Sequence, residues 1–364
     1  MKILLVHAYS PRNTGDGLLV DLARDVVHQA VPDAQIVCVA LDAGAFGTSD
    51  VVQWSPAAQV TDPRRAVLLA GVLGPHRALR AAFADADLIV AVGGGYLRAS
   101  TVGEGVKSFL AHVSQLRLVA RSTAPSVYLP QSIGPYPAPV RRLVQRLLAR
   151  IDLVCVRDDR SRAELAAAGT LERFPDLAVL EAGTMDRALQ ARTIDDVPVV
   201  VARELPGPRN YHRLLDGLGR ALGPVWAVQS TASNNNDVPL TARLAGTDDP
   251  PLLRDVLAGG TRRVVISTRL HGSMAALLAG SPTIHLSYER KGWGAFEDLG
   301  IARHVHNARN VDVDTVLAGV REITEDPATY WASVNERLPA VAARHRELVE
   351  RVGGLAAARA GVAR

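Results

Sequence analysis

An arginine and a histidine lie two positions apart in the segment STRLHG, residues 267–272, where an apolar run typical of a buried strand meets an alanine-rich helical pattern. The free amide groups and positive dipole end of a helix N-terminus bind anions, and the guanidinium of Arg269 adds a planar pair of donors for a carboxylate or phosphate. We expect His271 to be neutral in the empty site and to take up a proton when an anionic substrate arrives, as a general acid should. A structural histidine at a helix start is the simpler interpretation, and spacing alone leaves both open.

Other cations also follow strand-like runs. Arg157 ends the run LVCVR, and Lys291 follows IHLSYER one helix after His271. In a parallel sheet, side chains at the carboxyl ends of strands point to the place where ligands bind. We therefore favour anion binding by Arg157, although a solvent-exposed arginine is the default interpretation, and a solvated charge run would explain the segment around Lys291 equally well.

Glycines and uncharged polar residues end the remaining strands. Asn13, Gly15 and Asp16 form a turn before a helix, where they either cap the helix or approach a ligand closely. The run VGGGYLR suggests a surface free of side chains against which a substrate lies, or else a structural tight turn; it lacks the spacing of a dinucleotide-binding motif. The candidate residues for the acceptor or the cleft are Asn13, Gly15, Gly94, Gly95, Gln131, Ser132, Tyr288 and Asp237.

These residues need a scaffold of strands and helices to position them. Short β-branched runs alternate with helical patterns along the chain, and runs that are apolar on both faces are typical of parallel sheets covered on two sides. The sequence therefore predicts an α/β, doubly wound fold. The predicted strands are 2–9, 35–41, 87–93, 126–131, 153–157, 198–203, 224–229, 263–267 and 282–288.

A polar segment without a strong period divides the chain. We expect an N-terminal domain over 1–182, a linker over 183–197, a second domain over 198–327 and a helical segment over 328–364. Two such domains usually face each other across a cleft, and the loops 42–80 and 96–108 are expected to help form the acceptor site.

Composition excludes several classes of protein. The 364 residues are 48% apolar and 4% aromatic with a formal net charge of +4, and basic residues do not alternate with aromatic ones, so nucleic-acid binding is not expected. We expect the two cysteines to be reduced core residues, and no metal site. With no apolar run near the roughly 20 residues of a membrane span and no signal peptide, the chain is expected to be cytoplasmic. The basic, amphipathic segment 141–150 leaves peripheral membrane contact open, and the sequence leaves homo-oligomer formation open.

In order, the motifs NTGD, VGGGYLR, LPQSIGP, VRDDRS, FPDLAV, an ND pair and STRLHGSMAALLAGSPTIHLSYERKG resemble the polysaccharide pyruvyl transferase family. The resemblance extends from about residue 2 to about residue 300. It implies two Rossmann-like domains arranged as in the GT-B glycosyltransferases, with the active site between them.

The resemblance also implies a reaction. Phosphoenolpyruvate would donate its carboxyethylidene group to two hydroxyls of a sugar, glycan or lipid-linked saccharide, forming a pyruvate ketal and releasing phosphate without a cofactor. His271 would protonate the methylene carbon, and Asp16 is a candidate base. Donor binding would involve Arg157, Arg269, Leu270, Gly272 and Lys291.

Three alternatives stay open at this stage. A GT-B glycosyltransferase would bind the diphosphate of a nucleotide sugar with the same groups, and nucleotide binding would reveal it. A non-catalytic relative would bind an anion or sugar without turnover. A pyruvyl transferase acting on a small molecule would differ only in its acceptor.

Overall fold

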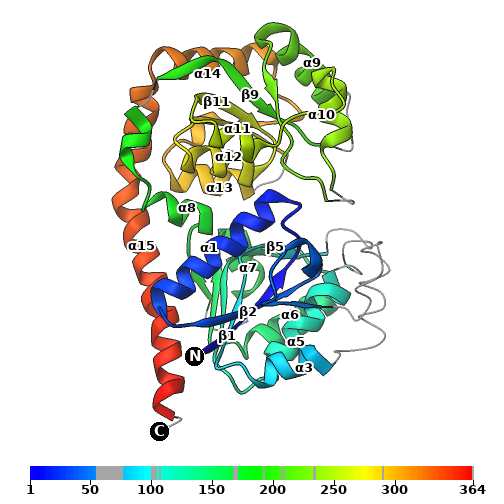
Figure 1. Cartoon of the computed structure of the whole chain (residues 1–364), viewed down its shortest axis with the longest axis vertical. Coiled ribbons are helices and arrows are strands. Elements are labelled where there is room, and N and C mark those ends of the chain that lie inside the picture. The colour runs from blue at the N-terminus through cyan, green and yellow to red at the C-terminus, as the bar shows by residue number, and fades with distance from the viewer. Residues whose placement is uncertain are drawn as a thin grey trace. The chain divides into compact units, whose positions relative to one another are not determined.

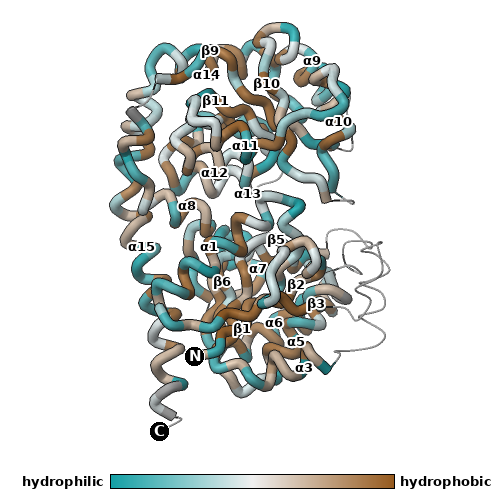
Figure 2. Tube along the Cα trace, viewed as in Figure 1, coloured by the Kyte–Doolittle hydropathy of each residue, from teal (hydrophilic) through white to brown (hydrophobic). Residues whose placement is uncertain are grey.

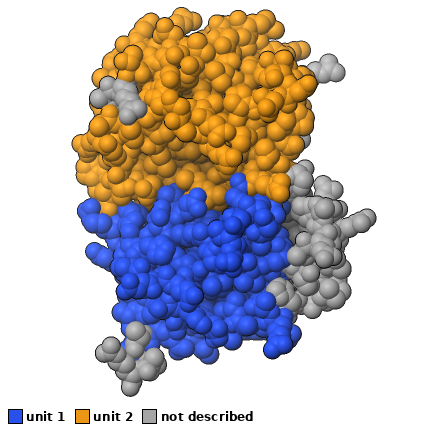
Figure 3. Space-filling view, viewed as in Figure 1, with its two compact units in different colours: residues 1–11, 19–177, 344–364 blue, residues 12–18, 178–343 orange. Residues whose placement is uncertain are grey.

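The computed structural model describes residues 1–54, 77–99, 105, 108–166, 171–191, 193–205, 207, 210–232, 235–288 and 291–362. Much of the predicted loops 42–80 and 96–108 lies outside these residues. The chain divides into two compact units (Figure 3): unit 1 contains residues 1–11, 19–177 and 344–364, and unit 2 contains residues 12–18 and 178–343. The predicted boundaries differ from this division, because residues 12–18 belong to unit 2 and the end of the chain belongs to unit 1.

Unit 1 contains an eight-stranded sheet in which each strand pair is parallel (Figure 1). The order is β3-β2-β1-β4-β6-β7-β8, and β5 pairs with β6. The strands are β1 (Lys2–Ala8), β2 (Gln35–Ala40), β3 (Val51–Gln53), β4 (Leu88–Ala91), β5 (Gly94–Leu97), β6 (Ser126–Ile133), β7 (Leu153–Val156) and β8 (Leu171–Arg173).

The helices of unit 1 bury both faces of its sheet. Every residue of β4 and β7 is buried, which requires cover on the two sides, and β1 is hydrophobic over most of its length (Figure 2). The helices are α1 (Thr14–Ala30), α3 (Arg77–Ala84), a π-helical turn (Phe109–Val113), α5 (Ser114–Val119), α6 (Ala138–Leu148) and α7 (Asp159–Glu164). The first turn of α1 belongs to unit 2. Cys38 and Cys155 are buried and free, as predicted, and burial raises the pKa of the Cys38 thiol to about 12.

Unit 2 contains a five-stranded parallel sheet in the order β10-β9-β11-β12-β13. Its strands are β9 (Ile194–Val201), β10 (Val225–Trp226), β11 (Arg262–Ser267), β12 (Thr283–Ser287) and β13 (Val305–Asn307). Its helices are α8 (Leu177–Ala182), whose first residue falls in unit 1, then α9 (Asn210–Leu222), α10 (Val238–Ala245), α11 (Leu253–Ala258), α12 (Leu270–Leu278), α13 (Lys291–Asp298), α14 (Val313–Glu325) and the first part of α15 (Pro327–Val362). Short 3-10 turns lie at Ala43–Ala45 in unit 1 and at Arg187–Ala191 and Ala302–His304 in unit 2.

The parallel sheets confirm the predicted α/β fold, and each predicted strand coincides with an observed one. The predicted linker differs from the structure, because β9 begins at Ile194 inside it. Asp195 and Asp196 lie at the partly exposed amino end of this strand. Their polarity gives the sequence there the appearance of a linker. Four short strands, β3, β5, β8 and β13, were not predicted, since none of them is a fully buried apolar run like β4 or β7.

The close approach of Gly183 to α15 gives a test of the packing in unit 2. A Cβ atom at Gly183 would lie 2.7 Å from the backbone nitrogen and 2.8 Å from the Cα of Ala342. We expect Gly183→Ala to lower the free energy of unfolding by about 1–3 kcal/mol, because backbone atoms cannot rotate away from the new methyl group. Urea unfolding measures the change.

Gly354 supplies the matched control, since it is exposed on the same helix with no atom within 4 Å of a Cβ there. Gly354→Ala should raise stability by about 0.5–1 kcal/mol through helix propensity. A Gly183→Ala protein as stable as the wild type would contradict the packing described.

Candidate functional site

The carboxyl ends of β9 and β11 lie side by side in unit 2. Val201 and Ser267 are partners in the parallel register, and Thr268 N–H and Oγ1 both donate to the Val201 carbonyl, at 3.0 and 3.1 Å. The Ser267 hydroxyl donates to the Arg269 carbonyl and accepts from the Arg269 N–H. This turn places Arg269 at the N-cap of α12 and His271 in its first turn. The structure therefore confirms the predicted strand-to-helix junction.

A buried ion pair fixes Arg269. Its Nε donates to Asp237 Oδ2 at 3.0 Å, its Nη2 also pairs with Oδ1 of the same carboxylate, and Nη2 donates to the Asn235 carbonyl at 3.1 Å. The side chains of Arg269 and Asp237 are only 8% and 1% exposed. Burial raises the pKa of Asp237, while the charge of Arg269 acts in the opposite direction. Arg269 was predicted to bind the donor and Asp237 to line the acceptor site or the cleft. In the structure, the two side chains bind each other.

The turn that contains Asn13 packs on the segment after β10. Asn13 forms an antiparallel bridge with Ser230, and the N–H and hydroxyl of Thr14 both donate to the Gln229 carbonyl. Asn13 Oδ1 accepts from the N–H of Gly15 at 3.2 Å. The asparagine therefore shapes the start of α1, and Asp16 lies in the first turn of that helix.

Gly15 and Gly272 both lie against the side chain of Gln229. A Cβ atom on Gly15 would lie 2.9 Å from Gln229 Nε2 and 2.9 Å from the Cβ of His271. A Cβ atom on Gly272 would overlap with Gln229 Oε1. Gln229 is 2% exposed, and its Oε1 has no hydrogen-bond partner among the described residues. Gln229 was not among the predicted site residues, although its position at the end of the predicted strand 224–229 could have indicated it.

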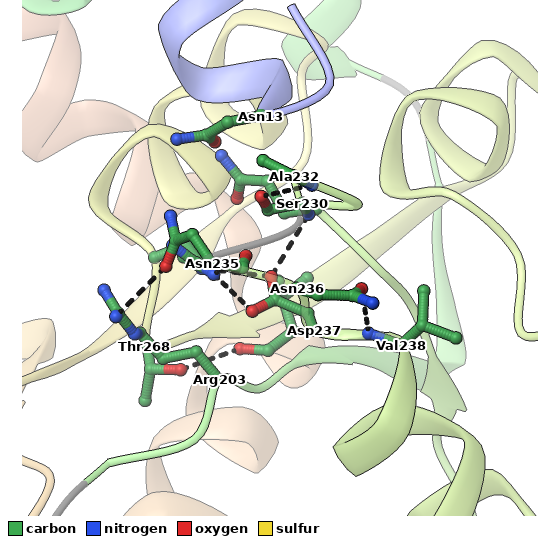
Figure 4. A network of polar contacts seen from close by, with 12 residues as sticks. Asn13, Arg203, Ser230, Ala232, Asn235, Asn236, Asp237, Val238 and Thr268 are labelled. Atoms are coloured by element: carbon green, nitrogen blue, oxygen red, sulfur yellow. Dashed lines mark hydrogen bonds and ion pairs between the residues drawn. The ribbon is translucent and has the colours of Figure 1, made fainter. Parts of the chain in front are cut away.

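Arg203 is a second functional candidate that was not among the predicted site residues. Its guanidinium donates to the Tyr288 hydroxyl and to Asn235 Oδ1, the latter at 3.2 Å, and lies 5.0 Å from the centroid of the Tyr288 ring. Figure 4 shows Arg203, Asn235 and Asp237 in one network of polar contacts. The run VVVAR ends in an arginine at a strand end, as the runs that end in Arg157 and Arg269 do. This pattern could have indicated Arg203 as a candidate site residue.

Two predicted donor-binding residues complete the unit 2 set. Leu270 is buried at the start of α12. Lys291 begins α13, but its side chain lies outside the described residues.

The remaining predicted site residues lie in unit 1. The Arg157 guanidinium pairs with Asp176 and donates from Nε to the Ser132 hydroxyl at 2.9 Å, and its side chain is 4% exposed. The Ser132 hydroxyl in turn donates to Asp158 Oδ2 at 2.5 Å. Arg157 is thus a buried, paired residue and not the exposed arginine that its sequence context suggests by default.

Packing accounts for much of the glycine run in unit 1. A Cβ at residue 93 would lie 2.7 Å from the Pro130 carbonyl oxygen, and one at Gly95 would lie 3.2 Å from Arg157 Nη2. Gly94 has a φ of 145°, which L-residues rarely adopt, and it pairs in register with the fully buried Gln131 of β6. The chain's own contacts therefore require glycine at residues 93 and 94 whether or not a substrate lies against them, and they leave little room for a side chain at Gly95.

A buried group of rings anchors the same run. His7 has a positive φ of 70°, stacks on Tyr96 at 4.6 Å and hydrogen-bonds through Nε2 to the Tyr128 hydroxyl at 2.9 Å. Burial and the neighbouring His112 hold the pKa of His7 well below its usual range, so the imidazole is neutral at pH 7. Among the described residues, no three histidines, cysteines or carboxylates are grouped so that they would hold a metal ion.

Solved structures similar to this chain share its fold. The UDP-GlcNAc 2-epimerase from Neisseria meningitidis bound to UDP-GlcNAc is 12% identical, with 96% of this chain and 99% of that chain covered and a TM-score of 0.52. The S. aureus MnaA-UDP co-structure is also 12% identical, with 97% and 94% covered and a TM-score of 0.50. This likeness supports the predicted GT-B-like fold.

The family comparison covers more than half of the chain. No curated protein sequence matches it. The polysaccharide pyruvyl transferase model matches residues 13–218, a range that includes the turn at Asn13, the glycine run, Arg157 and Arg203, and ends before Arg269 and His271. On this match, the chain belongs to the polysaccharide pyruvyl transferase family.

Proposed function

We propose that this protein transfers the carboxyethylidene group of phosphoenolpyruvate to two hydroxyls of a sugar or glycan acceptor. The observation that supports the proposal best is the start of α12, where a fixed arginine and a histidine stand at a helix N-terminus in a member of this family. Helix N-termini and arginines are suited to carboxylate and phosphate groups, and phosphoenolpyruvate contains one of each.

The chemistry assigns a distinct task to the histidine. Protonated His271 gives its proton to the methylene carbon of phosphoenolpyruvate, which becomes a methyl group and leaves C2 electrophilic. One acceptor hydroxyl then bonds to C2, and the second displaces phosphate from the same carbon. Of the two hydroxyl protons, one replaces the proton that His271 gave and the other leaves with phosphate. The products are a cyclic pyruvate ketal and inorganic phosphate, with no change of oxidation state.

The other predicted residues have supporting roles in this proposal. Leu270, Gly272 and Lys291 of unit 2 remain proposed donor-binding residues. Arg157 and Arg269, predicted for the same role, each already pair with a carboxylate of the protein. Asp16 remains the proposed base for an acceptor hydroxyl, because it lies in the first turn of α1, one residue after the glycine that contacts His271. The acceptor would be a glycan or a lipid-linked saccharide. Within the part of the chain that the structure describes, no helix has the length and apolar character needed to cross a bilayer.

A second candidate function is glycosyl transfer from a nucleotide sugar. It is favoured by the two similar structures that contain UDP or UDP-GlcNAc, since a helix N-terminus would also bind a diphosphate. The two candidates differ in their ligand, so one binding experiment separates them.

Phosphoenolpyruvate should bind the wild-type protein in a calorimetric titration, and UDP should not. His271→Asn keeps the size and polarity of the side chain but cannot act as an acid. We expect this variant to bind phosphoenolpyruvate within about threefold of the wild type and to release phosphate, in the presence of a sugar acceptor, at least ~10²-fold more slowly. Binding of UDP alone would replace pyruvyl transfer with glycosyl transfer, and unchanged turnover in His271→Asn would remove the histidine from the mechanism.

Gly15→Ala tests whether the Asn13 turn positions His271. The new methyl group would stand 2.9 Å from the His271 Cβ, so either the imidazole or the turn must move. We expect kcat/KM for phosphate release to fall at least ~10-fold, since a displacement of about 1 Å is enough to cost ~10²-fold in rate.

Gly44→Ala is the matched control, at an exposed glycine with no atom within 4 Å of a Cβ. It should leave kcat/KM unchanged. Full activity of Gly15→Ala, in a protein with an unchanged melting temperature, would mean that the turn does not constrain the histidine.

A further inference from the structure

The charges at the carboxyl edge of the unit 2 sheet are not equally available to a ligand. Arg269 is buried and makes two contacts with the carboxylate of Asp237, so its charge is largely neutralised within the protein. Arg203, in contrast, makes no ion pair with a carboxylate among the described residues, although its charge reaches Asp237 electrostatically. Of these two guanidiniums, that of Arg203 is therefore the one more available to an external anion.

The position of Arg203 in the sheet matches that of Arg269. Val201 and Ser267 are register partners in adjacent parallel strands, and each arginine follows its strand's partner residue by two positions. Both guanidiniums then reach the same residue: Arg203 Nη2 donates to Asn235 Oδ1 and Arg269 Nη2 donates to the Asn235 carbonyl. Arg203 therefore lies at the same edge of the sheet as the start of α12.

The contacts of Arg203 orient it without neutralising it. Its hydrogen-bond acceptors, the Tyr288 hydroxyl and the Asn235 amide oxygen, are uncharged, and the Tyr288 ring lies 5.0 Å from the guanidinium carbon. The Nε atom is buried and has no hydrogen-bond partner among the described residues. A half-buried guanidinium fixed by neutral groups keeps its full charge and has already lost much of its side-chain entropy, which favours anion binding.

We propose that Arg203 is the principal donor-binding cation of unit 2, and that the Arg269–Asp237 pair positions the α12 junction and Asn235 around it. The inference rests on the proposed function in that the anion is the carboxylate or phosphate of phosphoenolpyruvate. Tyr288, predicted as an acceptor residue, then acts as a support for the Arg203 side chain.

Two substitutions and one control test the assignment. Arg203→Gln removes the charge, and Arg203→Lys keeps the charge but loses the planar set of donors. Arg263→Gln is the matched control, because Arg263 is a partly exposed arginine near the amino end of β11, paired there with Asp195. Circular dichroism and thermal unfolding establish that each variant is folded.

Calorimetric titration with phosphoenolpyruvate and phosphate-release kinetics provide the measurements. We expect Arg203→Gln to raise both the Kd and the KM for phosphoenolpyruvate at least tenfold, Arg203→Lys to raise them at least threefold, and kcat to change less than KM in both. Arg263→Gln should stay within twofold of the wild type. A Kd for phosphoenolpyruvate in Arg203→Gln equal to that of the wild type would overturn the assignment and leave the proposed function standing.

A parallel titration with UDP separates the two proposals. If the wild type binds UDP and not phosphoenolpyruvate, the proposed function fails. Weaker UDP binding by Arg203→Gln would then still support Arg203 as the anion-binding residue. Unchanged UDP binding by Arg203→Gln would overturn the assignment of Arg203 as well. A folded wild type that binds neither ligand would overturn both proposals.

Discussion

The ion pair between Arg269 and Asp237 is the interaction on which the rest of the unit 2 site depends. It joins the N-cap of α12 to the N-cap of α10, and both side chains are almost entirely buried. A buried charge that loses its partner costs about 3–5 kcal/mol, so the two helix starts are held together as long as both residues are charged. The position of His271, in the first turn of α12, follows from this constraint. The position of Asn235 follows too, because its carbonyl accepts from the same guanidinium.

A steric constraint acts beside the electrostatic one. The side chain of Gln229 lies between two glycines that come from segments more than 250 residues apart in the chain, and neither glycine has room for a methyl group. The turn at Asn13 therefore belongs to unit 2 by its packing, although β1 and the greater part of α1 belong to unit 1. Hydrogen bonds from Thr14 to the Gln229 carbonyl fix the same approach.

Local patterns were sufficient to predict most of the fold. Alternating apolar and amphipathic runs located most strands of both sheets. The positions of the strand ends then identified the residues beside them, including Arg157, Arg269 and His271. The contacts that determine what those residues do are not local. Asp237 is 32 positions from Arg269, and Asp176 is 19 positions from Arg157, so no periodicity or motif indicates that each arginine already has a carboxylate partner. The assignment of residues 12–18 to unit 2 depends on Gln229, about 215 residues away, and is hidden from the sequence for the same reason.

An arginine at the end of a parallel strand is therefore an ambiguous indication of ligand binding. Arg157, Arg203 and Arg269 are examples, since each closely follows a parallel strand. Two are buried against carboxylates and contribute rigidity, whereas Arg203 is held by neutral groups and keeps its charge. Since an ion pair within the protein must be weakened before its guanidinium can bind an external anion, the arginine without a carboxylate is the one from which a ligand gains most. The partners of a cation, more than its place in a motif, decide whether it stabilises the fold or binds the substrate.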